Sequence, residues 1–181
     1  MERKQAQELA EALQGVKIFH GMSPQQIATV VGSAEPIALS AGEPVFREGD
    51  PVDGFYLLVS GSISVRRQLH GRETEVASLE AQTAIGESGM IGGDRRMASC
   101  VAATDCLLYK ISRSSFDRLC ASGSAATVRL VLNIASILRA RLDQLNRAFV
   151  ELSERAARGE GPEREVELEV FRRQLYTEWM F

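Results

Sequence analysis

The sequence predicts an α+β fold in which an eight-stranded antiparallel β-roll of the jelly-roll type (a double-stranded β-helix) carries helices at both ends. Three observations predict it. Residues 1–36 show helical periodicity. In residues 37–112, glycines interrupt short apolar runs about every ten residues, which is the spacing of small antiparallel sandwiches and barrels. Residues 113–158 return to a helical period, and a tail of residues 159–181 follows.

Composition excludes several classes of protein. The 181 residues allow one domain and a helical appendage. The net charge of −3 does not supply the positive field of a non-specific DNA-binding protein. Three scattered cysteines and two distant histidines predict neither a disulfide framework nor a metal site. Because no apolar run reaches roughly 18 residues and the N-terminus is charged, we expect a cytoplasmic protein without membrane insertion, metal or cofactor.

The N-terminal helices carry a clear start signal. Ser23 is expected to be an N-cap, Pro24 stands at the first helical position, and Gln26 closes a capping box. The preceding segment places Leu9 and Leu13 on one face. We therefore expect two helices before the first strand.

The long helix is expected to run from Thr127 to Arg158 after a short hinge helix, without Gly or Pro. Its apolar residues are spaced 3, 4, 4, 3, 4 and 3, as in a coiled-coil seam. They are Val131, Ile134, Leu138, Leu142, Leu145, Phe149 and Leu152. This seam predicts a parallel homodimer, and the alternative is a helix packed on its own β unit.

The tail follows a break at Gly161 and Pro162, and its pattern fits either a strand or a helix. It ends in Trp179, Met180 and Phe181. An aromatic terminus either docks onto the body of the dimer or binds a partner protein. We expect one of these two roles.

The segment Ala84–Cys100, AIGESGMIGGDRRMASC, has the composition of a phosphate-binding cassette. Its glycines let backbone N–H groups approach an anion closely. Arg96 can neutralise a phosphate with its planar fork, whereas Glu87 is suited to a hydroxyl donor such as a ribose. This chemistry fits a cyclic nucleotide, although a glycine-rich surface loop with a Glu–Arg ion pair is the alternative for the segment taken alone.

Residues 18–152 resemble the cyclic nucleotide-binding domain family, which includes bacterial catabolite activator-type regulators and the regulatory subunit of protein kinase A. The resemblance covers the entry helix KIFHGMSPQQIATVV, the first turn AGEPVFREGDPVDGFYLLVSGSISV, the cassette, the hinge helix SSFDRLC and the long helix. It implies the β-roll, a long dimer helix and binding of cAMP, with cGMP as the alternative ligand.

The resemblance also implies roles for individual residues. Glu87 takes the ribose hydroxyl, and Arg96, rather than the adjacent Arg95, takes the phosphate. The backbone that meets phosphate and ribose is that of Gly86, Ser88 and Gly89. The apolar lining around ribose and base is formed by Val65, Val76, Leu79 and Ile85. Asn146 on the long helix lies near the place where some dimeric members reach the adenine edge, including across the dimer.

Two residues depart from the family pattern. Ser88 replaces an aliphatic residue, and Met97 replaces a small residue or one with a hydroxyl. Met97 offers no side-chain hydrogen bond to a guanine amino group, which favours cAMP over cGMP. The 29 residues after Leu152 carry seven acids and five arginines, too few and too acidic for a DNA-reading module.

The resemblance therefore predicts a stand-alone cAMP receptor that signals to a partner protein through its helices. The alternatives are a nucleotide-free interaction module with the same fold and DNA-associated regulation through a supplied partner. The sequence has no recognisable nucleophile–base pair or metal cluster, so we do not expect an enzyme.

Overall fold

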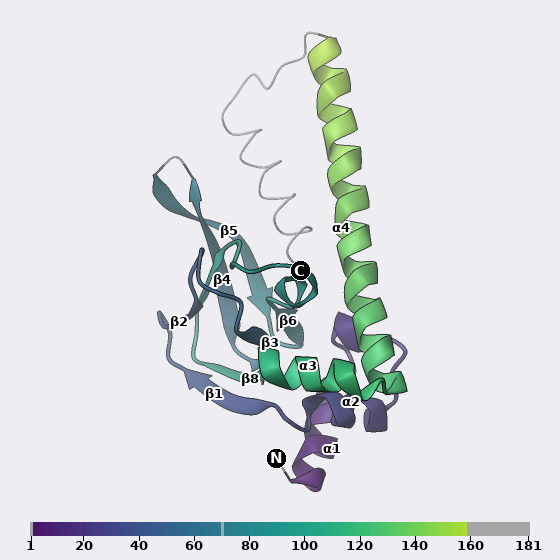
Figure 1. The fold of residues 1–181 in the computed structure, drawn as a ribbon. Helices are drawn as coiled ribbons and strands as arrows, with labels where there is room; N and C mark the ends of the chain where they lie inside the picture. Colours follow the sequence, from purple (N-terminus) through teal and green to yellow (C-terminus); the bar gives the residue numbers. More distant parts are fainter. Residues whose placement is uncertain (1, 70, 159–181) are drawn as a thin grey trace.

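The computed structural model describes residues 2–69 and 71–158 and has eight strands and six helical segments in this part of the chain (Figure 1). The helices are α1 (Arg3–Ala12), η1 (Lys17–Phe19), α2 (Pro24–Val31), η2 (Ser88–Ile91), α3 (Arg113–Ser122) and α4 (Ala125–Ala157). The strands are β1 (Glu35–Leu39), β2 (Pro44–Phe46), β3 (Gly54–Ser60), β4 (Ser62–Leu69), β5 (Arg72–Glu80), β6 (Thr83–Ile85), β7 (Ser99–Ala102) and β8 (Cys106–Ser112). The predicted α+β class and the antiparallel β-roll are confirmed.

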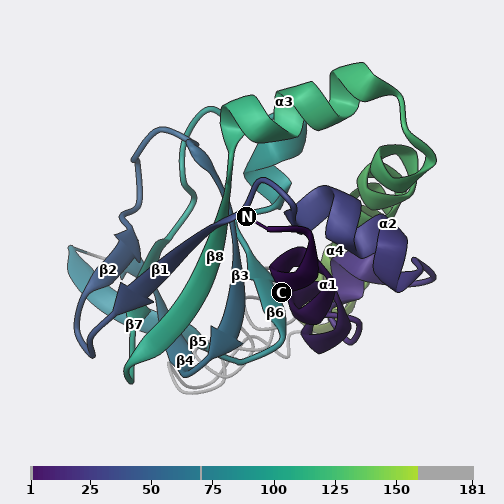
Figure 2. The same cartoon turned by 90° about the horizontal axis from the view of Figure 1, so that it is seen from below.

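The strands form two four-stranded antiparallel sheets, in the orders β1-β8-β3-β6 and β2-β7-β4-β5. Strand β3 reads as one apolar run because both of its faces are covered. Phe55 and Leu57 pack toward the helices, and Tyr56 and Leu58 pack into the interior of the roll. This alternation follows from the two-residue period of a strand. Figure 2 shows α1, α2 and α4 gathered on one side of the strands.

The predicted capping box at the start of α2 is confirmed. The Gln26 backbone N–H donates to Ser23 Oγ over 3.3 Å, and the Ser23 N–H donates to Gln26 Oε1 over 2.9 Å. Pro24 is the first residue of the helix. This cap fixes where α2 begins and therefore how its apolar face meets the core.

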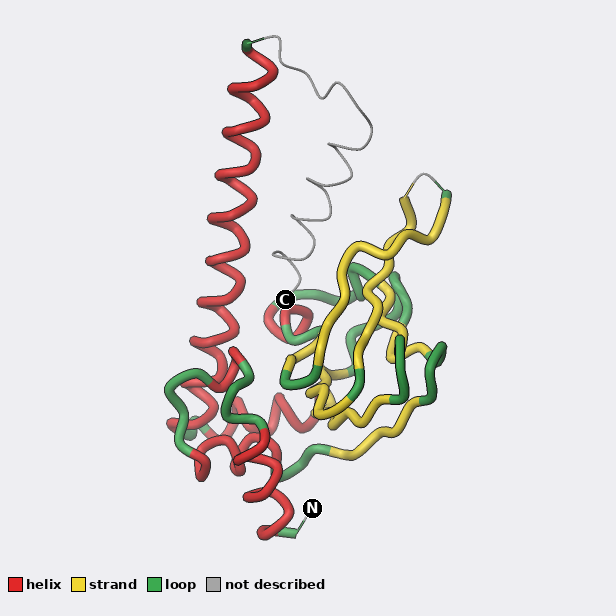
Figure 3. The backbone as a smooth tube through the Cα atoms, turned by 180° about the vertical axis from the view of Figure 1, so that it is seen from behind, coloured by secondary structure: helices red, strands yellow, loops and turns green. Residues whose placement is uncertain are grey.

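Helix α4 packs on the domain along its first half and extends beyond the roll along its second half (Figures 1 and 3). Leu130 and Ile134 are fully buried. Asn133 Nδ2 donates to the carbonyl oxygens of Ile18 and His20, each over 2.9 Å. The first half of α4 is therefore part of the domain's own core.

The first part of the predicted dimer seam is consequently wrong. Ile134 has no exposed surface, and Val131 and Leu138 pack partly buried against the same core. Leu142 and Phe149 are 54% and 69% exposed. The 3, 4 spacing alone does not distinguish a helix face that packs on its own domain from a face that meets a second chain.

Among the described residues no single helix is long and apolar enough to cross a membrane. The pair Arg113–Ser122 and Ala125–Glu151, bent by 119°, meets that test by length and composition alone. The predictions for the tail of residues 159–181, including its aromatic end, concern residues outside the described ranges.

Candidate functional site

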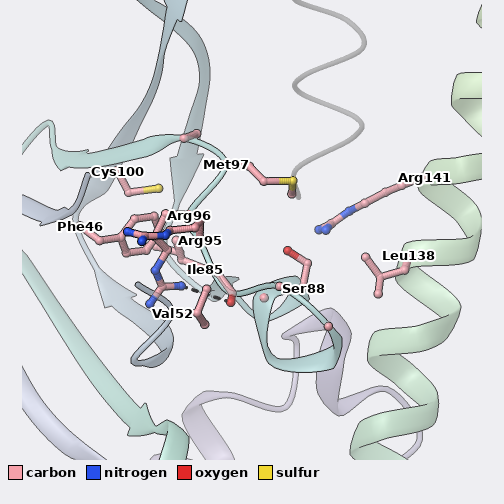
Figure 4. Close-up of a pocket in the computed structure, with 15 residues that line it drawn as sticks. Phe46, Val52, Ile85, Ser88, Arg95, Arg96, Met97, Cys100, Leu138 and Arg141 are labelled. Atoms are coloured by element: carbon pink, nitrogen blue, oxygen red, sulfur yellow. Dashed lines mark hydrogen bonds between the residues drawn. The ribbon is translucent and has the colours of Figure 1, made fainter. Parts of the chain in front are cut away.

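The cassette and helix α4 together enclose a cavity of about 260 Å³. Two apolar residues from the roll, Phe46 and Val52, line one side of it, and Leu138 and Arg141 of α4 line the other. The rest of the lining comes from the cassette: Ile85, Gly86, Ser88, Gly89, Gly92, Gly93, Arg95, Arg96, Met97, Ala98 and Cys100. Figure 4 shows these groups converging from the roll and from the long helix. Among the described residues, no group of His, Cys, Asp or Glu side chains could hold a metal ion.

Gly86 lies where the chain leaves β6 and enters the cassette. Its φ of 74° is in the left-handed region, and a Cβ there would lie 2.3 Å from Nη1 of Arg96. Glycine is therefore required both for the turn and for the approach of the guanidinium. The short helix η2 begins two residues later, at Ser88.

Arg96 is buried, with 2% of its side chain exposed, and it lines the cavity. Its Nη2 donates to Asp53 Oδ1 over 2.8 Å and to the Gly54 carbonyl oxygen over 2.7 Å. The guanidinium carbon lies 4.0 Å from the centre of the Phe46 ring. A buried cation thus lines the cavity, and its buried Nε–H has no hydrogen-bond partner among the described residues.

Asp53 holds Arg96 in place and is itself shared between two cations. Its Oδ1 accepts from Arg96, and its Oδ2 accepts from Lys110 Nζ. Partial burial acts to raise the pKa of Asp53, but the hydrogen bonds and charges of Lys110 and Arg96 outweigh it and hold the pKa below its usual value. Asp53 is therefore the counter-ion of Arg96 in this structure.

Glu87 forms a buried ion pair with Arg141 of α4. Its Oε1 lies 2.9 Å from Arg141 Nη2, and the two side chains are 2% and 9% exposed. Neither carboxylate oxygen of Glu87 has a partner with good hydrogen-bond geometry among the described residues. Burial raises the pKa of Glu87, against the opposing effect of the Arg141 charge. The pair ties the cassette directly to the long helix.

Arg141 lines two cavities, of which Glu87 lines only one. Glu87 lines a neighbouring cavity of about 200 Å³, together with residues of η1, the β5–β6 turn and α4. Arg141 lines both cavities, whereas Glu87 does not line the larger one. The larger cavity is therefore in contact with Arg141 and with Gly86 and Ser88, the chain neighbours of Glu87.

The structure brings together most of the cassette residues predicted from the sequence. Gly86, Ser88, Gly89, Arg96, Met97 and Ile85 all line the larger cavity. The predicted apolar residues Val65, Val76 and Leu79 are buried inside the roll and do not line this cavity. Asn146 is exposed on α4 and is absent from the lining. Arg95 is exposed, yet it also lines the cavity, and its Nη1 donates to the Gly49 carbonyl oxygen.

Two important residues were not predicted. Asp53 has no sequence signal, because it lies 43 positions from Arg96 in the chain. Arg141 has one: it continues the inward row of Leu130, Ile134 and Ile137, where a charged residue interrupts an apolar face. A single arginine at such a position predicts a buried acidic partner.

Residues 36–122 match the family model of the cyclic nucleotide-binding domain. This match covers the roll, the whole cassette and α3. The segment belongs to the cyclic nucleotide-binding domain family.

Relatives of two kinds are similar to the chain. A cAMP-dependent protein kinase regulatory subunit from Aspergillus niger is 34% identical over 107 residues, which are 59% of this chain and 26% of that protein. The Cyclic AMP receptor protein of Thermus thermophilus is 29% identical over 150 residues, which are 81% of this chain and 66% of that protein. The chain thus spans only about a quarter of the kinase subunit's length.

A solved structure agrees on the fold. The Thermus thermophilus Catabolite Activator Protein matches with a TM-score of 0.68 and 24% identity, over 88% of this chain and 82% of that one. The cyclic nucleotide-binding domain thus has relatives named for cAMP, and it carries the cassette beside the cavity described above.

Proposed function

We propose that this protein is a cyclic nucleotide receptor, that its ligand is cAMP, and that the ligand occupies the 260 Å³ cavity. The observation that carries the proposal is Arg96. A buried guanidinium with an unpartnered Nε–H at a cavity wall is suited to an anion, because unpaired buried donors are costly and rare. Relatives named for cAMP support the choice of ligand.

The chemistry of the lining assigns the parts of the ligand. The cyclic phosphate belongs at Arg96 and the backbone of Ser88 and Gly89, where a cation and N–H groups meet. The ribose hydroxyl belongs at Glu87, a buried carboxylate with no well-formed hydrogen bond. The base belongs toward the apolar side of the cavity, which includes Ile85 and Leu138.

Met97 supports adenine over guanine at this site. Its side chain lies at the cavity and is 53% exposed. A thioether provides apolar surface but no strong hydrogen bond for the guanine amino group. The site therefore favours cAMP over cGMP.

Signalling through α4 follows from the Glu87–Arg141 pair. A ribose that engages Glu87 competes with Arg141 for the same carboxylate. Release of Arg141 removes one of the contacts that hold α4 against the cassette, so ligand binding favours a different position of the helix. A partner protein reads that position, and the tail of residues 159–181 is the candidate contact.

A second copy of the chain is the proposed occupant of the outward face of α4. Five exposed apolar side chains lie within one stripe of this helix, about 100° wide at 3.6 residues per turn: Val128, Leu132, Leu142, Phe149 and Val150. Asn146 lies on the same stripe between Leu142 and Phe149. A polar residue at one seam position fixes the register of a coiled coil, so Asn146 is suited to that role in a parallel homodimer.

The second candidate function is an interaction module that binds no nucleotide. It is favoured by the ion pairs that both charged residues already make: Arg96 with Asp53, and Glu87 with Arg141. Such a site is partly satisfied without a ligand.

Isothermal titration of the full chain with cAMP, cGMP and 5′-AMP separates the two functions. The receptor proposal expects saturable binding of one cAMP per chain, with weaker binding of cGMP and of the doubly charged, open 5′-AMP. If none of the three nucleotides binds, the result contradicts the receptor proposal and supports the interaction module.

A further inference from the structure

Arg113, the first residue of α3, contacts two parts of the proposed phosphate site: helix η2 of the cassette, and Asp53, the counter-ion of Arg96. Its Nη1 donates to the Gly89 carbonyl oxygen over 3.1 Å and to the Met90 carbonyl oxygen over 3.3 Å. Its backbone N–H donates to the Asp53 carbonyl oxygen over 2.8 Å. Gly89 belongs to η2 of the cassette, and Asp53 is the counter-ion of Arg96. Arg113 is therefore hydrogen-bonded both to the cassette and to the residue that holds Arg96.

The position of Arg113 is not explained by the stability of α3. A cation in the first turn of a helix lies at the positive end of the helix dipole, where it is disfavoured. The cap of α3 is provided instead by Ser112, whose Oγ accepts the Ser115 N–H. At the end of η2, by contrast, a cationic donor lies at the negative end of the helix, where it adds to the backbone N–H groups of Gly92 and Gly93 that already donate to the Gly89 carbonyl oxygen. The guanidinium thus serves the cassette rather than its own helix.

Helix α3 is in turn positioned to transmit a movement to α4. Phe116, one turn after Arg113, packs edge-on against Phe55 of β3 with ring centres 6.2 Å apart. The helix ends at Gly123, whose φ of 60° turns the chain into α4. A displacement of η2 would therefore move the first turn of α3 about an anchored aromatic residue.

We propose that Arg113 is a positioning residue that couples the occupied cassette to helix α3. Arg113 donates to the carbonyl oxygens of Gly89 and Met90 and does not line the cavity. This inference rests on the proposed function, because the coupling has meaning only when a nucleotide is bound. It adds a second route from the site to α4, independent of the Glu87–Arg141 pair.

The chain contains its own position for a probe. Cys120, near the end of α3, is exposed, whereas Cys100 and Cys106 are buried. A maleimide fluorophore therefore labels Cys120 in the folded full-length chain. Its emission on titration with cAMP reports the movement of α3, while calorimetry on the same samples reports affinity.

The test compares Arg113→Met with Arg118→Met. Arg118 is the matched control, because its Nη2 donates within α3, to Ser115 Oγ. The parent and Arg118→Met should show a cAMP-dependent change in emission, and Arg113→Met should lose most of it. Since binding no longer moves α3, the affinity of Arg113→Met should equal or exceed that of the parent. Arg113→Lys, which retains a cationic donor, should restore part of the response.

Each other outcome has a definite meaning. A full response in Arg113→Met, no response in a parent that binds cAMP, or a loss of affinity of more than about tenfold in Arg113→Met overturns the coupling role and leaves the receptor proposal standing. No binding of cAMP by the parent removes the proposed function itself. If Arg113→Met does not fold, Arg113→Gln takes its place with the same expected loss of response.

Discussion

Arg141 of the long helix and Glu87 of the cassette are 2.9 Å apart, and both are almost completely buried. Each is the other's charged partner. Removing one member of such a pair leaves a charge buried alone, whereas removing both is often tolerated. The pair therefore contributes to the free energy of unfolding in a strongly non-additive way.

The first prediction concerns this non-additivity. Arg141→Met should lower the free energy of unfolding by about 3–5 kcal/mol, because it leaves the Glu87 carboxylate buried without its cation. Glu87→Gln should lower it less, because burial already disfavours the charged form of Glu87, and the double variant should lose much less than the sum. Urea unfolding of the four proteins measures the cycle. Arg139→Met is the control, because the Arg139–Asp143 pair on the same helix is exposed, with 3.7 Å between its atoms. Additive losses would show that the two charges do not interact in solution.

The second prediction concerns the order of effects on ligand affinity. Arg96→Leu should weaken cAMP binding by about 2–5 kcal/mol, because the cyclic phosphate loses the buried cation at the wall of the cavity. Glu87→Ala should cost about 1–3 kcal/mol, as expected for one hydrogen bond to a charged group. Arg95→Leu should cost least, since Arg95 is exposed. Calorimetric titration gives the order, and equal effects at Arg95 and Arg96 would contradict the assignment.

The third prediction concerns acid stability. The pKa of Asp53 is lower in the folded protein than its ordinary value of 3.8, because Lys110 and Arg96 outweigh the effect of burial. Its contribution is therefore fully present above about pH 4 and disappears as the pH falls through the folded pKa. Asp53→Asn should lower the melting temperature at neutral pH and should make the melting temperature depend less on pH in the acid range. The exposed Asp94→Asn should leave both unchanged.

The pKa of Glu87 is shifted in the direction opposite to that of Asp53. Burial raises the pKa of Glu87 above its ordinary value of 4.5, so its favourable contribution is present at low pH and is lost as the pH rises through the folded pKa. In the double variant Glu87→Gln, Arg141→Met, this loss should be absent. The free energy of unfolding of the parent and of the double variant, measured between pH 4 and pH 8, shows whether this loss occurs.

The fourth prediction concerns assembly. Leu142→Glu with Phe149→Glu should convert a dimer to a monomer in light scattering, because both side chains lie on the exposed apolar stripe of α4. Ala140→Glu with Arg147→Glu adds acids at exposed positions outside that stripe and should leave the mass unchanged. The same mass for both double variants would remove the stripe from the interface.

The class of fold and the cassette could be predicted from the sequence because their signals are local. The capping box of Ser23 and Gln26 lies within four residues, and Glu87 and Arg96 share one glycine-rich segment. The partners of those charges could not be predicted, since Asp53 and Arg141 reach them only through the tertiary fold. Val65 has the same apolar pattern as Ile85, and only the three-dimensional arrangement shows that Ile85 alone lines the cavity.

In the proposed function, the second half of α4 acts as a lever. Arg141 lies at its fulcrum, where the helix still touches the domain, and the helix continues to Ala157 beyond the roll. At 1.5 Å per residue this arm is about 24 Å long, so a tilt of about 10° at Arg141 would carry its end by about 4 Å. A change no larger than the exchange of one ion pair is thus amplified into a displacement comparable with the width of a side chain.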